Sequence, residues 1–455
     1  MLTALNEHFA LSRARLIAYF CRAPRLGGWV CRRALLCFAV LFVCSPVWSQ
    51  EILRNEEESE AAPDRLLIPF AFYNDTIGLA VGLTYAGRGL LQPQTTFWST
   101  AVVADSGTQF LFFGARDFRT SFADRLLYDV RFAIGDFSEI DVYADGNPDF
   151  PDEIAGSNDS DPDNFIQSEG TDGAFDVELR YLLPLGAGRE QNEFDVVLRD
   201  GLVVAGGRVP KVWNPLKSGL TTIKLRPFYR SQDTDSDLGD AELTTAFVAF
   251  SLEYDNTDFS VNPSRGSRQE VSVSRDWGAF DSSGPWTAIA FELSKFVSLG
   301  ETDKARSRVL ALNFWLIDTP TWNSGSEARG FHRPPPYAGA SLGGLRRMRG
   351  YPEGRFNSRS AVYYTAEYRY IPHWNRPSEW AILKRFNIDL DWLQLVGFAE
   401  LGRVADEFDL SELHSDMQWS GGVGIRAFAN HLIVRAEVAA SDEDAILVMS
   451  INQPF

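Results

Sequence analysis

The chain has 455 residues, of which 45% are hydrophobic and 23% charged, and its formal net charge is −18. We expect no nucleic-acid partner for so acidic a chain, because phosphate backbones are bound through basic patches. Aromatic residues make up 13%, with 33 Phe and only 4 Met, and this mixture favours strands over helices.

The first 49 residues are expected to be a signal peptide with a long N-terminal leader. Residues 34–48 form an apolar run that follows Arg32 and Arg33, and Val47-Trp48-Ser49 offers small or short residues around a cleavage site. This order is typical of secretory signal peptides. A membrane anchor is the alternative, but the run is shorter than the roughly 20 residues that a helical span needs.

Cysteine usage indicates what the exported chain lacks. The four cysteines are Cys21, Cys31, Cys37 and Cys44. Cleavage near Ser49 would therefore leave a chain without disulfides or thiolate metal sites. Residues 50–65 are polar and acidic and are expected to be a flexible lead-in, and residues 66–455 are expected to form one domain.

From about residue 66 onward, apolar and polar residues alternate with a period of two, which is typical of strands with two different faces. One example is residues 432–438, where Arg435 and Glu437 oppose Leu432, Val434, Ala436 and Val438. A soluble sandwich with one wet face would show the same period. The export signal, the aromatic-rich apolar faces and the charges of both signs opposite them favour a barrel with lipid outside and a polar lumen.

The pattern predicts an all-β fold, a transmembrane antiparallel β-barrel of the outer-membrane type with about sixteen strands. The candidate strands are 76–87, 95–104, 108–116, 125–135, 174–184, 193–204, 219–230, 243–256, 267–277, 285–298, 306–317, 360–371, 393–403, 418–429, 431–440 and 444–455.

Strand parity tests this assignment. If the first strand runs outward, connections after even-numbered strands face the periplasm and should be short. Residues 105–107, 299–305 and Asn430 fit, but the acidic segment 136–173 does not, because its length suits an outer loop. Either an early strand is misassigned or this segment is an exception. We favour a solvated loop over a calcium site here, because the segment lacks EF-hand spacing.

Residues 342–356, LGGLRRMRGYPEGRF, carry a family resemblance. Met348-Arg349-Gly350-Tyr351 resembles the (V/I)-R-G-(F/Y) signature of a long outer loop in the BamA-like family of outer-membrane assembly factors, also called the bacterial surface antigen family. Other matching pieces follow the family's order: a turn with Asp255, Asp258, Pro263 and Gly266, the strand 366–370, a strand with Phe398, Glu400 and Gly402, the glycine-rich segment 421–426, and the terminal Phe455. In the third piece, Glu400 replaces the family's Asp.

The resemblance implies a role for each residue. Arg349 would enter the lumen on the loop and pair with Glu400, bidentately if the geometry allows. Gly350 would let the loop approach the wall, and Tyr351 would pack inside. The turn from Asp255 to Gly266 would be periplasmic. The terminal Phe455 would lie on the lipid-facing side of the last strand, with Leu447, Met449 and Ile451, as a signal for the outer-membrane assembly machinery.

The resemblance also implies a function, which is to assist insertion or translocation of proteins or lipids at the bacterial outer membrane. The alternatives are a passive or selective pore, or a structural surface antigen. Little sequence precedes the barrel, so we expect the barrel domain alone, without the family's periplasmic POTRA modules. The expected partners are the lipid bilayer and a separate periplasmic protein. We expect no enzyme, metal or cofactor, because hydrolase, metalloprotease and phosphate-loop motifs are absent from the sequence.

Overall fold

The computed structural model of the chain describes residues 51–55, 65–74, 78–192, 194–206, 213–325, 331–373, 390–429 and 432–455. The expected signal peptide lies outside these ranges. Within them, no helix is long and apolar enough to span a membrane. The described elements are strands and three short 3₁₀ turns, η1 (Gly186–Arg189), η2 (Pro336–Ala338) and η4 (Glu412–His414).

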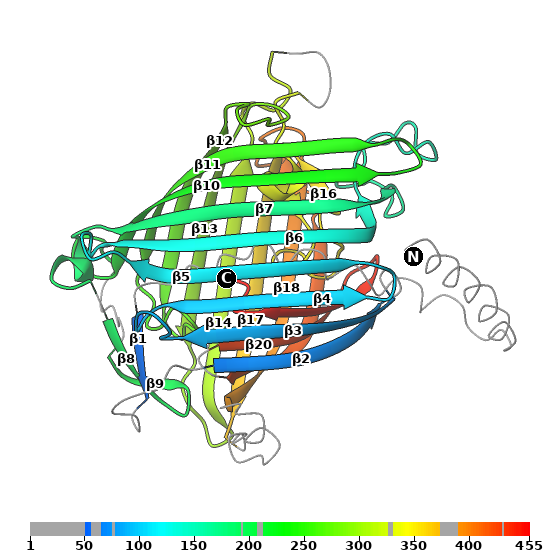
Figure 1. Cartoon of the computed structure of the whole chain (residues 1–455). Coiled ribbons are helices and arrows are strands. Elements are labelled where there is room, and N and C mark those ends of the chain that lie inside the picture. Colours follow the sequence, from blue (N-terminus) through cyan, green and yellow to red (C-terminus); the bar gives the residue numbers. More distant parts are fainter. Residues whose placement is uncertain are drawn as a thin grey trace, which may run out of the picture.

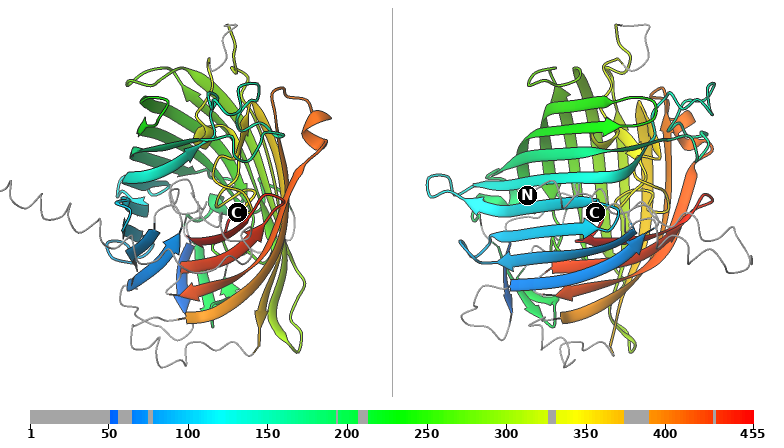
Figure 2. Two further views of the ribbon diagram at one scale, coloured as in Figure 1. Left: turned by 90° about the vertical axis from the view of Figure 1, so that its right-hand side faces the viewer. Right: turned by 45° about the vertical axis from the view of Figure 1, so that its right-hand side comes forward.

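One sixteen-stranded antiparallel sheet makes up the barrel wall. Its strands, in order around the wall, are β2 (Arg65–Asn74), β3 (Gly78–Arg88), β4 (Thr96–Ala104), β5 (Gln109–Arg119), β6 (Leu126–Val142), β7 (Ile166–Leu182), β10 (Leu220–Asp235), β11 (Ala241–Asp255), β12 (Gly266–Asp276), β13 (Trp286–Ser298), β14 (Ala305–Asp318), β17 (Ser360–Pro372), β18 (Leu390–Ala405), β19 (Gln418–Ala429), β20 (Leu432–Ala440) and β21 (Ala445–Ile451). The sheet curls so that its first and last strands come to the same side of the barrel (Figures 1 and 2). The expected outer-membrane barrel fold is confirmed.

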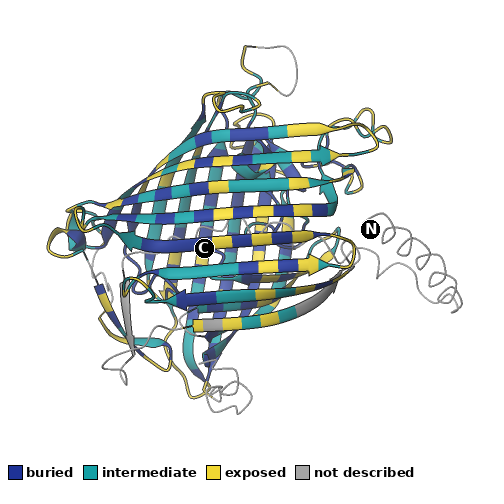
Figure 3. Cartoon of the chain, in the orientation of Figure 1, coloured by how far each residue is buried: buried dark blue, intermediate teal, exposed yellow. Residues whose placement is uncertain are grey.

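The two faces of the wall have the reverse of the polarity found in a soluble protein, because charged side chains are buried and apolar ones are exposed. In β20, Arg435 and Glu437 are each 1% exposed, whereas Val438 is 50% exposed. Figure 3 shows the same alternation of buried and exposed positions along the front strands. Exposed apolar side chains and buried charges are the arrangement of a barrel with lipid outside and a polar lumen.

Two strand assignments were wrong, and the errors cancel in the count. Residues 65–74 form β2, a wall strand that the alternation missed, and residues 193–204 are not a wall strand. They fall instead in a hairpin of β8 (Phe194–Arg199) and β9 (Leu202–Gly206). The two residues between these strands, Asp200 and Gly201, have φ values of 45° and 68°. Such a pair makes a tight hairpin turn that reverses the chain.

The correction resolves the parity conflict. We name the end with connection 319–359 the outer end and the end with turn 256–265 the periplasmic end. With β2 as the first wall strand, residues 143–165 connect the fifth and sixth strands at the outer end. Residues 105–107, expected at the periplasmic end, also belong to the outer end.

A second, three-stranded sheet lies at the periplasmic end (Figure 1, lower left). It joins β8 and β9 to β1 (Glu51–Asn55), which pairs with β8 in parallel from Glu51↔Phe194 to Asn55↔Leu198. The expected flexible lead-in at 50–65 is therefore wrong for residues 51–55. Residues 56–64 lie outside the described ranges.

Candidate functional site

The connection 319–359 folds into the lumen. Its short strands β15 (Ala340–Leu342) and β16 (Phe356–Ser358) form a two-stranded ladder. Leu342 and Phe356, at 0% and 1% exposure, pack in one apolar cluster with wall residues such as Trp286 and Trp315. This cluster fixes the base of the loop, so the segment between the two short strands is presented to the wall in a defined position.

Arg349 is fully buried and is held by three carboxylates. Its backbone N–H and Nε–H donate to Glu400 at 2.7 and 2.9 Å, and its Nη1 donates to Glu367 at 2.9 Å and Glu437 at 2.7 Å. Its guanidinium carbon lies 3.5 Å from the ring centroid of Phe398. The structure thus brings Arg349 and Glu400 together, but the guanidinium bridges three strands rather than pairing bidentately with one carboxylate.

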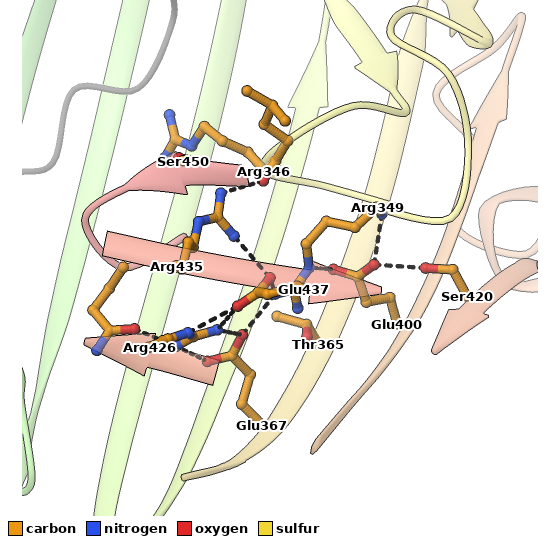
Figure 4. Close-up of polar contacts among 12 residues, drawn as sticks. Arg346, Arg349, Thr365, Glu367, Glu400, Ser420, Arg426, Arg435, Glu437 and Ser450 are labelled. Atoms are coloured by element: carbon orange, nitrogen blue, oxygen red, sulfur yellow. Dashed lines mark hydrogen bonds and ion pairs between the residues drawn. The ribbon is translucent and has the colours of Figure 1, made fainter. Parts of the chain in front are cut away.

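Three further arginines extend this network, and Figure 4 shows two of them, Arg426 and Arg435. Arg426 donates through both Nη atoms to Glu367 at 2.9 and 2.7 Å and also contacts Glu437. Arg435 donates to Glu437 at 3.0 Å, and Arg369 donates to Glu367 at 2.9 Å. Because buried charges are stable only when paired and hydrogen-bonded, the wall must provide these carboxylates before the loop can seat. We name Arg349, Glu367, Arg369, Glu400, Arg426, Arg435 and Glu437 the lumen network.

Glu400 is oriented by its neighbours on the wall. Tyr363 Oη–H donates to its Oε1 and Ser420 Oγ–H to its Oε2, both at 2.6 Å. A Cβ added at Gly402 would lie 2.8 Å from Leu342 and 3.2 Å from Met348, so glycine leaves room for the loop. The three residues of the predicted partner strand therefore all face the loop, with Phe398 beneath the guanidinium.

The residues after Arg349 fix the loop against β19, β20 and the turn 441–444. A Cβ added at Gly350 would lie 2.8 Å from the carbonyl carbon of Ala440, so only glycine fits without displacement. Tyr351 is fully buried, and its hydroxyl donates to Asp442 at 2.6 Å.

Arg355 is a second anchor that the sequence analysis missed. It is 1% exposed, and its Nε and Nη2 donate to the two carboxylate oxygens of Glu443, both at 2.8 Å. Its Nη1 donates to Ser160 Oγ at 2.7 Å, and Asn357 N–H donates to Gly156 O at 2.7 Å. The acidic segment 136–173 was expected to be a solvated loop, but part of it packs on the lumen loop.

Glu353 lies on the same loop among basic side chains. Burial raises the pKa of its carboxyl to about 7, although Arg230, Arg347 and Arg346 oppose this shift. The carboxyl therefore titrates near neutral pH.

The motif turn between β11 and β12 has a structural role. Asp255 accepts from Thr257 N–H at 2.8 Å, and Asp258 accepts from the N–H groups of Phe259, Ser264 and Arg265. Pro263 is buried, and Gly266 has φ +100° with the carbonyl oxygen of Asn256 2.3 Å from an added Cβ. These contacts hold a tight turn at the periplasmic end.

The expected position of Phe455 was wrong. Leu447 is 55% exposed, as a lipid-facing residue should be, but Phe455 is 7% exposed and stacks on Phe296 with ring centroids 6.2 Å apart. Strand β21 ends at Ile451, and Asn452 has φ 72°, so the last residues turn into the lumen. There Arg369 lies 5.2 Å from the Phe455 ring centroid.

These features define an outer-membrane β-barrel with a loop anchored inside its lumen. Residues 173–432, more than half of the chain, match the Omp85 superfamily domain. The chain belongs to the Omp85 superfamily, and the resemblance to BamA-like proteins and the outer-membrane localisation are confirmed.

Several solved structures resemble this chain at low sequence identity. CdiB from Escherichia coli is 11% identical with a TM-score of 0.50, and the match covers 86% of this chain and 61% of CdiB. BamA from Haemophilus ducreyi lacking POTRA domains 1–3 is 11% identical with a TM-score of 0.44, covering 86% and 69%. CdiB from Acinetobacter baumannii is 11% identical with a TM-score of 0.47, covering 86% and 59%. The chain thus spans about three fifths of the two CdiB proteins. A comparison with curated proteins found no match.

Proposed function

We propose that this barrel assists the insertion or translocation of proteins or lipids at the bacterial outer membrane. Membership of the Omp85 superfamily supports a role in handling other molecules at that membrane. The observation that carries the proposal is the seating of Arg349 at 0% exposure against three strands of the wall. A loop that only covers the outer end would not need its tip buried and paired with three wall strands. These contacts hold the loop in one position, which gives the lumen a fixed surface for binding a client. We further propose that a separate periplasmic protein delivers the client and that no catalytic step takes place.

A depletion strain tests this proposal. The outer membrane of cells lacking the protein is compared by quantitative proteomics and lipid analysis with that of cells complemented by the wild type or by Arg349→Ala. Loss of specific barrel proteins or lipids, restored by the wild type and not by Arg349→Ala, would support it. Arg347→Ala is the matched control, because Arg347 lies two positions before Arg349 on the same loop but pairs with Glu292 at 3.2 Å and stays 19% exposed. An unchanged membrane composition after depletion would contradict the proposal.

A selective pore is the second candidate, and a cavity favours it. The lumen contains a cavity of about 210 Å³ between the loop and strands β10–β14, lined by charged residues such as Lys224, Arg226 and Glu292. Steady ion conductance of the wild type in planar bilayers, together with unchanged membrane composition after depletion, would favour the pore over the assembly role.

A further inference from the structure

The connection between β7 and β10 spans residues 183–219 at the periplasmic end and contains the β8–β9 hairpin. Several other connections at this end, such as 299–304 and 430–431, are short. A barrel needs only a short turn to join neighbouring antiparallel strands. The hairpin is therefore not needed to connect the two wall strands.

One face of the hairpin is buried inside the mouth of the barrel. Val196 and Leu198 are 0% and 1% exposed. They belong to one apolar cluster with a residue from each of four neighbouring wall strands, Ile371, Trp392, Phe428 and Ile433, all at 0% exposure. On β17, β19 and β20, Ile371, Phe428 and Ile433 are an even number of positions from Glu367, Arg426 and Glu437 of the lumen network. Side chains at such positions point to the same face of a strand, which here is the inward face. The hairpin therefore packs against the lumen side of the wall and not against its lipid side.

The hairpin crosses the mouth. It is rooted between β7 and β10, but its turn contacts strands on another part of the wall. Trp392 Nε1–H, on β18, donates to the carbonyl oxygen of Gly201 at 2.9 Å. Arg306, on β14, donates to the backbone carbonyl and the carboxylate of Asp200 at 3.1 and 3.2 Å. A Cβ added at Gly201 would lie 2.6 Å from Asp391 Cβ, so the turn fits closely against this strand.

Two other segments lie at the same end of the lumen as the hairpin. Phe259 and Val261, in the turn between β11 and β12, are 1% and 3% exposed and belong to the same apolar cluster. Asn262 of that turn accepts a hydrogen bond from Gln453 Nε2–H at 2.9 Å, which joins the turn to the C-terminal residues. The hairpin, the turn and the C-terminal residues thus meet at one end of the lumen.

We propose that the β8–β9 hairpin is a plug that closes the periplasmic end of the lumen, and that passage through the lumen requires it to leave the mouth. Its apolar face excludes water and ions from the mouth, because an unpaired charge in an apolar environment is strongly disfavoured. In the described part of the chain, its turn is held to the wall by side chains of Arg306 and Trp392 and is not hydrogen-bonded into the wall's own ladder, so the hairpin can detach as a unit while the wall stays intact. This inference does not depend on the proposed assembly function.

Ion conductance in planar bilayers tests the plug. Leu198→Asp places a carboxylate in the apolar cluster, whereas Val204→Asp changes the same hairpin at a residue that is 44% exposed. Leu198→Asp and a deletion of residues 194–206 should raise the conductance roughly tenfold over the wild type, because a hydrophobic constriction is lost, and Val204→Asp should leave it unchanged. A wild-type conductance equal to that of the deletion variant overturns the proposal, and so does a deletion variant that conducts no better than the wild type.

Cysteine labelling keeps the test valid if Leu198→Asp fails to fold. No cysteine follows Cys44 in the sequence, so single cysteines can be introduced on a clean background. In the folded protein, Leu198→Cys should react with a water-soluble maleimide at least about tenfold more slowly than Val204→Cys, because local opening must precede its reaction. Equal rates for the two cysteines would show that the mouth is open.

Discussion

Arg349 and Glu400 meet through two hydrogen bonds of different kinds. The backbone N–H of Arg349 donates to one carboxylate oxygen at 2.7 Å, and its Nε–H donates to the other at 2.9 Å. One wall residue therefore fixes both the path of the loop backbone and the direction of the guanidinium. This leaves Nη1 free to reach Glu367 and Glu437, so the same pairing directs the loop toward the rest of the lumen network.

We predict that Arg349→Ala destabilises the barrel more than any other single arginine change on the loop tip. Removing one partner from a buried ion pair typically costs about 3–5 kcal/mol, because the remaining charges stay buried without compensation. Arg347→Ala should cost at most about 1 kcal/mol, since its pair with Glu292 is partly solvated. The free energy of unfolding in detergent, followed by heat-modifiable migration on gels, measures both. Equal costs would show that the lumen network does not hold the loop.

The glycine beside Arg349 gives a second prediction. Gly350→Ala would place a Cβ within 2.9 Å of Ala440 and Ser420, so the loop tip must move and the contacts of Arg349 lengthen. We expect a loss of about 1–3 kcal/mol from this overpacking. Gly397→Ala, on β18, is the control, because no atom lies within 4 Å of its added Cβ. Urea unfolding of the two variants side by side would decide, and a Gly350→Ala variant as stable as Gly397→Ala would disprove the close fit.

Much of the fold was accessible from the sequence, because one face of each wall strand must be apolar. The alternation located β20 to within one residue, but it ended β6 seven residues early and began β7 eight residues late. It missed β2 because RLLIPFAFYN is nearly continuous in apolar residues and contains Pro69, which is tolerated on an edge strand. The Asp200-Gly201 pair, a strong hairpin signal, could have separated β8 from β9 before the structure was known.

The candidate site was only partly accessible. The family motif located Arg349 and Glu400, but nothing in one sequence states which inward-facing charges become neighbours. Glu367 and Glu437 lie on β17 and β20, separated by two strands in the wall, and only the barrel's register and curvature bring both to Nη1 of Arg349. The position of Phe455 failed for a related reason, since period-two alternation does not report where a strand ends and the backbone turns at Asn452.

Glu353 predicts a pH dependence of loop seating. Its pKa is about 7 in the folded protein and about 4.5 in an unfolded chain, so the folded state binds this proton more tightly. The corresponding stabilisation is complete below the unfolded pKa and is lost as the pH rises through about 7. The loop of the wild type should therefore be cleaved faster by added protease at about pH 8 than at about pH 5.5, and Glu353→Gln should reduce this difference. A difference that is unchanged in Glu353→Gln would assign it to other groups.

The inward turn of the C-terminus separates two roles of Phe455. As a packing residue, its ring stacks on Phe296 beneath Arg369, so Phe455→Ala should destabilise the purified, folded barrel. Loss of a buried Phe side chain typically costs about 3–5 kcal/mol, and we expect the lower part of this range for a residue at the end of the chain. Met449→Ala, at a position 36% exposed on the lipid-facing side, is the control and should cost less. Because urea unfolding of refolded protein in detergent involves no cellular machinery, a stability loss there reports packing alone. A purified Phe455→Ala variant as stable as the wild type, but poorly assembled in cells, would instead show that the residue acts only as an assembly signal.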